Sequence, residues 1–238
     1  MIQNRTPFLN KISASLNRTE INAQPPVKEW QHRPVEKKLS HLTSDELMPA
    51  FIEQCGVLKN TTIVEVEAAQ AMKEIDAAVQ KFGGQSVALW DDERLTALGI
   101  EQLTTSKWID EGMAVHIWDS ALGRTENFER TNASNIGIAY AEYALAESGT
   151  VVLYSAEGQG KAVGLLPNVF IAIVKKSTLL PRMTQAAIKI KEDFAGDQLL
   201  PASVDFISGP SNSADIEMDL VVGVHGPIFA HYIVLSDQ

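Results

Sequence analysis

The chain has a single cysteine, Cys55, among its 238 residues. One thiol cannot close an intrachain disulfide, and by itself it cannot hold an iron-sulfur cluster or a structural zinc ion. We therefore expect no cofactor bound by this chain itself and place any redox metal centre in another chain. Cys55 also lies far in sequence from other reactive groups, so we expect a small buried hydrophobic residue rather than a nucleophile.

Positive charge is scarce, with 20 Lys and Arg against 30 Asp and Glu and a formal net charge of -10. Nucleic-acid affinity comes largely from cationic side chains that neutralise phosphates, so nucleic acid is not an expected partner. The segment Lys28 to Lys38 is the nearest approach to a basic cluster, but acids and prolines interrupt it. Proteins or small molecules, such as a small organic acid, are the expected partners.

Long apolar runs are missing as well. No stretch approaches the length of a membrane span, and Asn4, Arg5, Asn10 and Lys11 interrupt the apolar residues near the N-terminus. We expect no membrane span and a cytoplasmic location. The composition, 45% hydrophobic and 21% charged, is typical of a folded globular protein with one principal domain.

The first 41 residues differ from the rest of the chain. Apolar residues at helical spacing predict an amphipathic helix over residues 7–16, with Thr6 as its cap and Pro7 in its first turn. Residues 22–40 contain three prolines and many charges, a pattern typical of an extended connector. We therefore divide the chain into an N-terminal helix and linker, 1–41, and a compact domain, 42–238.

Helix and strand signals alternate along the second part. Helix signals cover residues 43–55, 67–82 and 181–194, with a short helix after Asp91. Strand signals cover residues 62–66, 86–90, 115–118, 150–154, 169–174, 204–207 and 228–235. Residues 136–146 are apolar and fit either state. The alternation predicts an α/β sheet flanked by helices.

Residues 209–227, GPSNSADIEMDLVVGVHGP, combine turn formers, hydroxyls and ionisable groups at unusual density. Because each buried polar group needs a partner, such density favours a site over scaffold alone. Our candidates here are Asp215 and His225 for catalysis, and Gly209, Ser211, Ser213 and Gly226 for substrate binding.

The three carboxylates of this stretch admit two interpretations. In a strand, Asp215, Glu217 and Asp219 share one face and could hold a hard cation. In a helix, Asp215 instead follows a cap at Asn212 or Ser213. Sequence alone leaves metal binding and a surface role open.

His225 lies between glycines and a proline, where a tight turn could hold its ring at a pocket mouth as a proton carrier. A turn histidine bonded to backbone is the alternative, and both stay open. His231, in an apolar strand, is expected to be structural.

A second candidate stretch is Ala146 to Thr150. Glu147 offers a carboxylate for catalysis, while Ser148, Gly149 and Thr150 offer hydroxyls and a flexible backbone for a substrate oxyanion or carboxyl group. The alternative is a helix that ends at Gly149.

The glycines at 158, 160 and 164 have the wrong spacing for a dinucleotide fingerprint, and Gly160-Lys161 lacks the remaining residues of a P-loop.

Taken together, these stretches resemble the LUD domain family. The resemblance lies in Gly209-Pro210-Ser211, in Ala214 to Glu217, in Gly223 to Pro227, in the Ala146 to Thr150 turn and in Leu165-Leu166-Pro167. It covers roughly Leu42 to the C-terminus, and the N-terminal segment is similar too. It implies an α/β fold akin to the NagB, RpiA and CoA-transferase group. Phe170 stands where the family often has His or Tyr, which weakens any proton chemistry there.

The resemblance also implies a function. Members of this family are components of a cytoplasmic system that oxidises L-lactate to pyruvate, and the resemblance implies the same role here. The iron-sulfur clusters of that system lie in partner proteins. One alternative is a self-sufficient enzyme or ligand-binding protein of the CoA-transferase-like fold, acting on an acyl-CoA, a sugar phosphate or a folate-like substrate. A purely structural or interaction role is another alternative.

Overall fold

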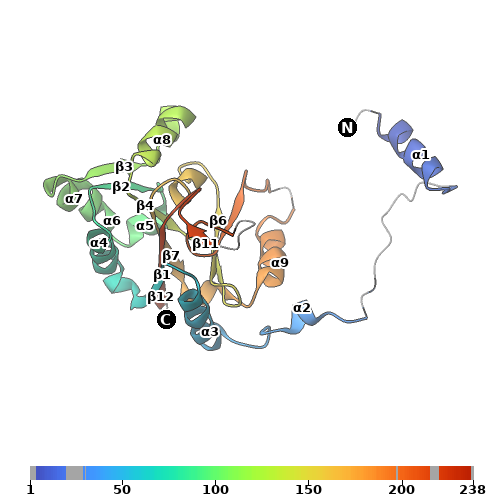
Figure 1. Cartoon of the computed structure of the whole chain (residues 1–238), viewed down its shortest axis with the longest axis horizontal. Coiled ribbons are helices and arrows are strands. Elements are labelled where there is room, and N and C mark those ends of the chain that lie inside the picture. The colour runs from blue at the N-terminus through green and yellow to red at the C-terminus, as the bar shows by residue number, and fades with distance from the viewer. Residues whose placement is uncertain (1–3, 20–28, 30, 197, 215–219, 237–238) are drawn as a thin grey trace. The chain divides into compact units, whose positions relative to one another are not determined.

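The structure is a computed structural model that describes residues 4–19, 29, 31–196, 198–214 and 220–236. It divides into two compact units, Met1–Pro34 and Val35–Gln238 (Figure 1). The sequence predicts that the compact domain begins at residue 42, and this boundary stays a prediction.

The first unit contains helix α1, Arg5–Ser15. The helix begins directly after Asn4, whose φ is 61°, so Thr6 lies inside the first turn and is not the cap that the sequence predicted. No residue of α1 is buried, and the apolar side chains of Phe8 and Ile12 are 63% and 41% exposed.

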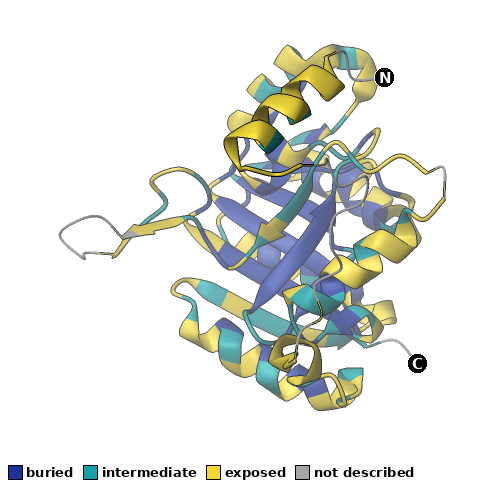
Figure 2. Cartoon of the chain, turned by 90° about the vertical axis from the view of Figure 1, so that its right-hand side faces the viewer, coloured by how far each residue is buried: buried dark blue, intermediate teal, exposed yellow. Residues whose placement is uncertain are grey.

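The second unit is built on a six-stranded parallel sheet in the order β1-β12-β7-β4-β2-β3. Its strands are β1 (Thr61–Glu67), β2 (Ser86–Leu89), β3 (Ala114–Ile117), β4 (Ile136–Tyr140), β7 (Val169–Lys175) and β12 (Phe229–Ser236). β4, β7 and β12 are buried almost throughout, as Figure 2 shows, because helices cover both faces of a parallel sheet. The predicted α/β class is confirmed.

Further helices follow α1 along the chain. They are α2 (Pro34–Lys37), α3 (Ser44–Val57), α4 (Ala71–Lys81), α5 (Glu93–Ala97), α6 (Ile100–Gln102), α7 (Trp108–Asp110), α8 (Gly123–Asn132) and α9 (Met183–Asp193). α3 begins where the helix signal of residues 43–55 starts, with Thr43 as its cap in a capping box with Glu46. β1 extends to Glu67 and a short 3-10 helix, Ala68–Gln70, follows it, so α4 begins four residues later than predicted.

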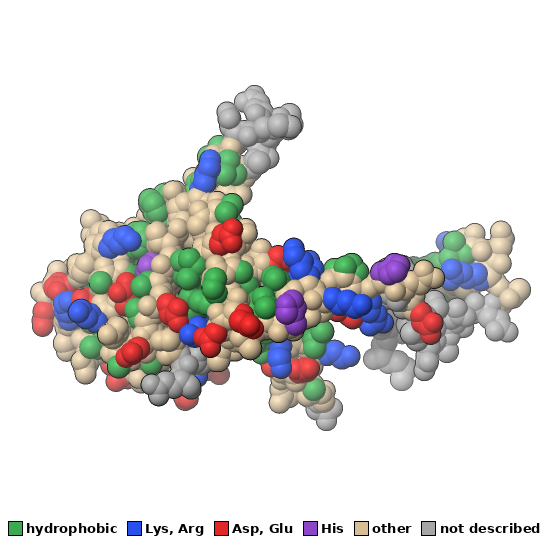
Figure 3. Space-filling model, turned by 90° about the horizontal axis from the view of Figure 1, so that it is seen from below, with side chains coloured by type: hydrophobic (Ala, Val, Ile, Leu, Met, Phe, Trp, Pro, Cys, Tyr) green, Lys and Arg blue, Asp and Glu red, His purple; other side chains and the backbone are tan. Residues whose placement is uncertain are grey.

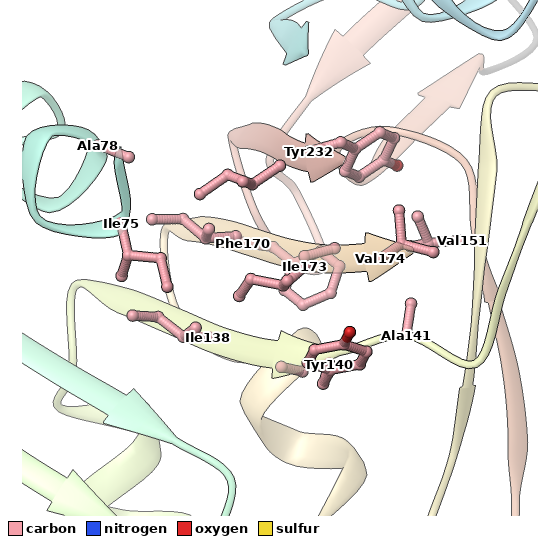
Figure 4. Packing of buried hydrophobic residues seen from close by; sticks show 14 of the residues in the cluster. Ile75, Ala78, Ile138, Tyr140, Ala141, Val151, Phe170, Ile173, Val174 and Tyr232 are labelled. Carbon is pink, nitrogen blue, oxygen red and sulfur yellow. The ribbon is translucent and has the colours of Figure 1, made fainter. Parts of the chain in front are cut away.

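The main core lies between the sheet and these helices. Figure 4 shows Ile75 and Ala78 of α4 facing the buried side chains of the central strands. On the other side, Phe51 of α3 stacks on Tyr232 of β12, with ring centroids 6.1 Å apart. Each fully buried side chain of this size contributes roughly 1.5–3 kcal/mol, so this core dominates the stability of the domain.

A smaller sheet in the order β8-β5-β6-β9 packs beside the first. Its strands are β5 (Tyr143–Leu145), β6 (Thr150–Tyr154), β8 (Leu179–Leu180) and β9 (Val204–Ile207). The ambiguous segment 136–146 is therefore two strands, β4 and β5, that belong to different sheets. A separate hairpin joins β10 (Asn212–Ala214) to β11 (Leu220–Val222).

Across the described ranges, no helix combines the length and the apolar character needed to cross a membrane.

Candidate functional site

The motif at residues 209–227 connects β9 of the small sheet to β12 of the main sheet. Gly209 has a φ of 69°, and its N–H donates to the Tyr232 hydroxyl at 2.8 Å. A Cβ at Gly209 would lie 2.7 Å from Thr61 Oγ1. Close backbone packing against β1 and β12 therefore requires glycine here.

Two backbone hydrogen bonds close the base of the hairpin β10–β11. The Ser211 N–H donates to the Pro227 carbonyl at 2.9 Å, and the Gly223 N–H donates to the Ser211 carbonyl at 2.8 Å. A Cβ at Gly226 would lie 3.1 Å from Ser211 Cβ. Ser211 and Gly226 thus hold the two ends of the motif together where it returns to the sheet.

The ionisable residues of the motif do not converge within the described structure. His225 is exposed, and among the described residues it makes no hydrogen bond or ion pair. Ser213 is exposed on β10, while Asp215, Glu217 and Asp219 lie outside the described residues. The described ranges contain no cluster of three His, Cys, Asp or Glu side chains arranged for a metal ion.

The second predicted stretch is the turn between β5 and β6, not a helix end. Ser148 Oγ lies 2.6 Å from Thr150 Oγ1, which lies 2.6 Å from Ser208 Oγ. A Cβ at Gly149 would lie 2.9 Å from Leu58 Cδ1, and Gly149 has a φ of 62°. The hydroxyls here bond to one another, so this turn is internally satisfied.

Glu147 lies between two cations. Its Oε1 is 2.7 Å from Lys38 Nζ and its Oε2 is 2.8 Å from Arg182 Nε. A cavity of about 770 Å³ adjoins it, lined also by Met183 and Ile188 of α9. The paired carboxylate ties residues before α3 to the start of α9.

Among the described residues, the two predicted stretches approach each other beside Leu58. Thr150 and Ser208 share a hydrogen bond, and Gly149 and Gly209 both pack against Leu58. No described hydrogen bond or ion pair joins Glu147 to His225. The predicted site residues therefore remain candidates, distributed between a turn of the small sheet and the amino edge of the main sheet.

A polar crevice lies at the opposite, carboxyl edge of the main sheet. From β2 the chain first moves outward to β3, then returns to β4 and continues in the other direction to β7 and β12. The strand order therefore reverses between β2 and β4, and open α/β sheets bind ligands at the carboxyl ends of strands at such a point. The crevice there has a volume of about 640 Å³.

Arg94 is the central cation of this crevice. Its Nε lies 2.9 Å from Asp92 Oδ1 and its Nη2 lies 2.7 Å from Asp92 Oδ2, while its Nη1 lies 2.8 Å from Glu142 Oε1. The guanidinium also stacks over the Tyr140 ring, 4.5 Å from its centroid. Three partners thus fix the orientation of Arg94.

Asp92 is the buried anchor of this network, because its side chain is only 3% exposed. It caps α5 by accepting the Arg94 N–H, and it also accepts from Gln159 Nε2 at 2.9 Å. Removing this carboxylate would release both Arg94 and Gln159.

Glu142 has the surroundings of an acid or base. Burial raises the pKa of its carboxyl, and the Arg94 guanidinium opposes that shift. The charge of Asp193, whose carboxylate accepts from Tyr143 and Tyr154, favours the protonated form further. A carboxyl group held in this way can exchange a proton with a bound ligand nearer neutral pH than a solvated one can.

Two glycines bring the loop after β6 against the ends of β2 and β3. A Cβ at Gly158 would lie 2.9 Å from the Asp91 carbonyl oxygen, and a Cβ at Gly160 would lie 2.2 Å from the Trp118 ring. The Gly160 carbonyl accepts from Trp90 Nε1 at 2.9 Å. These glycines therefore position Gln159 at the crevice.

The sequence contained a signal for this crevice that our interpretation missed. Polar residues follow β2 at Asp91 to Arg94 and follow β4 at Glu142, each directly after a buried strand. These positions lie at the carboxyl edge of the sheet. They predict a shared site only when the order of the strands is known, and that order comes from the fold.

His231 and Cys55 have structural surroundings. His231 is buried, its Nδ1 lies 2.7 Å from Thr62 Oγ1, and burial lowers the pKa of its ring to about 4. Cys55 is buried under the Gly149 turn, and burial raises the pKa of its thiol to about 12. A thiol of this kind remains neutral at physiological pH.

The chain is similar to known proteins in both sequence and fold. The model of the LUD domain matches residues 50–235. Lactate utilization protein C of Geobacillus sp. strain WCH70 and that of Bacillus subtilis strain 168 are each 42% identical over 237 residues, which cover 100% of this chain and 98% of each relative. The crystal structure of a DUF162 family protein from Deinococcus radiodurans shares the fold with a TM-score of 0.55 and 17% identity, covering 82% of this chain and 99% of that one.

Proposed function

The chain belongs to the LUD domain family, and from this premise we propose that it serves lactate utilization as a component of a cytoplasmic system that oxidises L-lactate to pyruvate. The single observation that carries the proposal is its full-length similarity to two proteins named lactate utilization protein C. Similarity over the whole length, including the N-terminal unit, supports a shared role more strongly than a matching domain alone.

The proposed reaction needs an electron acceptor. Oxidation of L-lactate to pyruvate releases two electrons and two protons, and an acceptor must take the electrons. We propose that iron-sulfur clusters in partner proteins are this acceptor. The one cysteine of this chain supports the division, because a cluster requires several thiolate ligands and Cys55 is buried as a neutral thiol.

We propose the crevice at β2 and β4 as the place where this chain contacts a ligand. Glu142 supplies a carboxyl group with a raised pKa for proton exchange. Arg94 is oriented by Asp92, and because Asp92 and Glu142 compensate its charge, it offers N–H groups to a polar ligand rather than a free positive charge. The catalytic candidates His225, Glu147 and Asp215 rest on the sequence alone. Glu147 is less suited to nucleophilic attack, because two cations bind its carboxylate.

Growth on L-lactate tests the proposal. A strain that lacks this chain and any substituting lactate dehydrogenase is expected not to grow on L-lactate as sole carbon source, while growth on pyruvate is retained. Restoring the chain restores growth. Normal growth of the deletion strain on L-lactate would refute the proposed function.

A further inference from the structure

Another cavity, of about 300 Å³, lies next to the crevice at the carboxyl end of β3. Trp118, which directly follows β3, lines it, and we call it the Trp118 cavity. Further lining residues come from α8, from the loop after β6 and from the segment before β9: Arg124, Phe128, Ser155, Gly160, Lys161 and Ser203. The loop after β6 also supplies Gln159 to the crevice, so the crevice and the Trp118 cavity share this loop as a wall.

The lining of the Trp118 cavity contains two cations, Arg124 and Lys161, and no carboxylate. The crevice is the opposite, because its lining has one arginine among five Asp and Glu side chains. The chain as a whole is acidic, with 30 Asp and Glu against 20 Lys and Arg, and Figure 3 shows carboxylates spread over the face of the domain that it presents. A local excess of positive charge in such a chain favours an anionic ligand.

Both cations are available to a ligand. Among the described residues, neither Arg124 nor Lys161 forms an ion pair with a carboxylate. The Arg124 guanidinium stacks over the Phe128 ring, 5.1 Å from its centroid, and this contact orients the group without neutralising its charge. An oriented guanidinium can bind a carboxylate or a phosphate through two parallel hydrogen bonds.

Aromatic rings form the apolar part of the lining. The rings of Trp118 and Phe128 meet edge to face, with centroids 6.1 Å apart. The Trp118 N–H donates to the Leu89 carbonyl at 2.8 Å, and the backbone of Gly160 packs so closely that a Cβ there would lie 2.2 Å from the Trp118 ring. The rings are therefore held in place before a ligand binds. Preformed cavities with aromatic walls and a few polar groups are typical of small-molecule sites.

The two serines of the lining already use their hydroxyl groups as donors. Ser155 Oγ donates to the Ser203 carbonyl at 3.2 Å and accepts from the Ser203 N–H at 2.7 Å. The Ser203 hydroxyl donates to Asp205 Oδ2 at 3.0 Å. These bonds fix the backbone beside the cavity, and the cations of Arg124 and Lys161 are left to meet an anion.

We propose that the Trp118 cavity binds a small anionic ligand that contains one planar ring. The ring packs against Trp118, and a carboxylate or phosphate on the ring is bound by Arg124 and Lys161. A volume of about 300 Å³ lies at the lower end of the range for small-molecule sites, so a single ring with its anionic group suits it. Binding at this cavity requires neither lactate nor an iron-sulfur partner.

Isothermal titration calorimetry of the purified full-length chain tests this inference. Benzoate and phenyl phosphate each combine a ring with an anionic group, whereas benzyl alcohol lacks the charge and inorganic phosphate lacks the ring. The tighter of the two ring-bearing anions should bind about tenfold more tightly than either incomplete probe. The comparison of benzoate with phenyl phosphate shows which anionic group the two cations prefer.

Arg124→Gln and Lys161→Gln should each raise Kd for the tighter probe about tenfold, because each removes one cation and keeps a polar side chain. Both side chains are exposed, so both variants are expected to fold, and an unchanged Tm checks this. Arg130→Gln is the matched control, because it removes the same charge from the same helix outside the lining of the Trp118 cavity. It should leave Kd unchanged.

Three results would overturn the inference. The first is that neither benzoate nor phenyl phosphate binds the wild-type chain. The second is a Kd that Arg124→Gln or Lys161→Gln leaves unchanged, since the anion would then lie elsewhere. The third is an incomplete probe that binds as tightly as the ring-bearing anions, since either the ring or the charge would then contribute nothing.

Discussion

Glu142 and Glu147 are near neighbours in the chain, but their surroundings give them different capacities. Lys38 and Arg182 bind the two oxygens of Glu147, so its charge is compensated and its role is to join two segments. Glu142 has one cationic partner and is buried enough for its pKa to rise. As glutamates, the two residues are equal candidates for proton exchange, and only their hydrogen-bond and ion-pair partners distinguish them.

Glu142→Gln tests the crevice. The substitution keeps the size and polarity of the side chain but removes the titrating carboxyl group. We expect lactate oxidation by the assembled system to fall at least tenfold, and the acid limb of the pH profile to change because Glu142 no longer titrates. The measurement is the rate of lactate oxidation as a function of pH.

Glu129→Gln, on the exposed surface of α8, is the matched control and should leave the rate and the pH profile unchanged. An unchanged rate and profile for the Glu142 variant would show that this carboxyl takes no part in the reaction.

His231 makes stability depend on pH. Its folded pKa of about 4 lies below the ordinary value of 6.5, so the unfolded chain binds the proton more readily. The stabilisation relative to the unfolded chain is complete above pH 6.5 and decreases as the pH falls toward 4, by about 3 kcal/mol in all. Chemical denaturation between pH 7 and pH 4 measures this loss.

His231→Asn removes the titrating ring while retaining a polar group near Thr62 Oγ1, which bonds to His231 Nδ1. The variant should start from a lower stability at pH 7 and lose less of it on acidification. The same pH slope in both proteins would contradict the assignment, because other titrating groups would then account for the acid sensitivity.

At the scale of elements, most helices and strands follow from sequence pattern. β4, β7 and β12 are continuous apolar runs because both faces of the sheet are covered, and the capping box at Thr43 marks the start of α3. Residues 136–146 were ambiguous because the break at Ala141 and Glu142 separates two buried strands without a proline or glycine. β4 pairs with β2 and β7 in the main sheet, and β5 pairs with β6 and β8 in the smaller sheet, so pairing with distant strands makes both segments strands.

The glycines show where local pattern is insufficient. Gly158 and Gly160 invite comparison with nucleotide motifs, but their absent side chains allow close contact with Asp91 and Trp118. The density of polar residues at 209–227 predicts a site, and that stays a prediction. In the structure Gly209, Ser211 and Gly226 contribute close packing and backbone hydrogen bonds. A glycine required by packing and one required by a ligand look alike in a single sequence.

The crevice was not predicted for a related reason. Asp92 and Arg94 lie at the start of α5, whereas Glu142 follows β4 and Gln159 lies in the loop after β6. Glu142 meets Arg94 because β2 and β4 are neighbours. Strand order is a long-range property that no local period encodes. The family resemblance was confirmed because it depends on several motifs in a fixed order along the chain.

At the scale of the whole domain, the two edges of the parallel sheet carry different surfaces. The crevice of Arg94 and Glu142 lies at the carboxyl edge, and the base of the hairpin returns to the sheet at the amino edge of β12. In our account the crevice at the carboxyl edge is the place of ligand contact and proton exchange.

The central claim is that this chain is a required component of lactate oxidation although the redox clusters lie elsewhere. The most direct test is the rate of L-lactate-dependent reduction of an artificial electron acceptor by the purified iron-sulfur partners, measured with and without this chain. Our account predicts that pyruvate forms and the acceptor is reduced only when the chain is present. Equal rates with and without it, from partners that retain their clusters, would contradict the account.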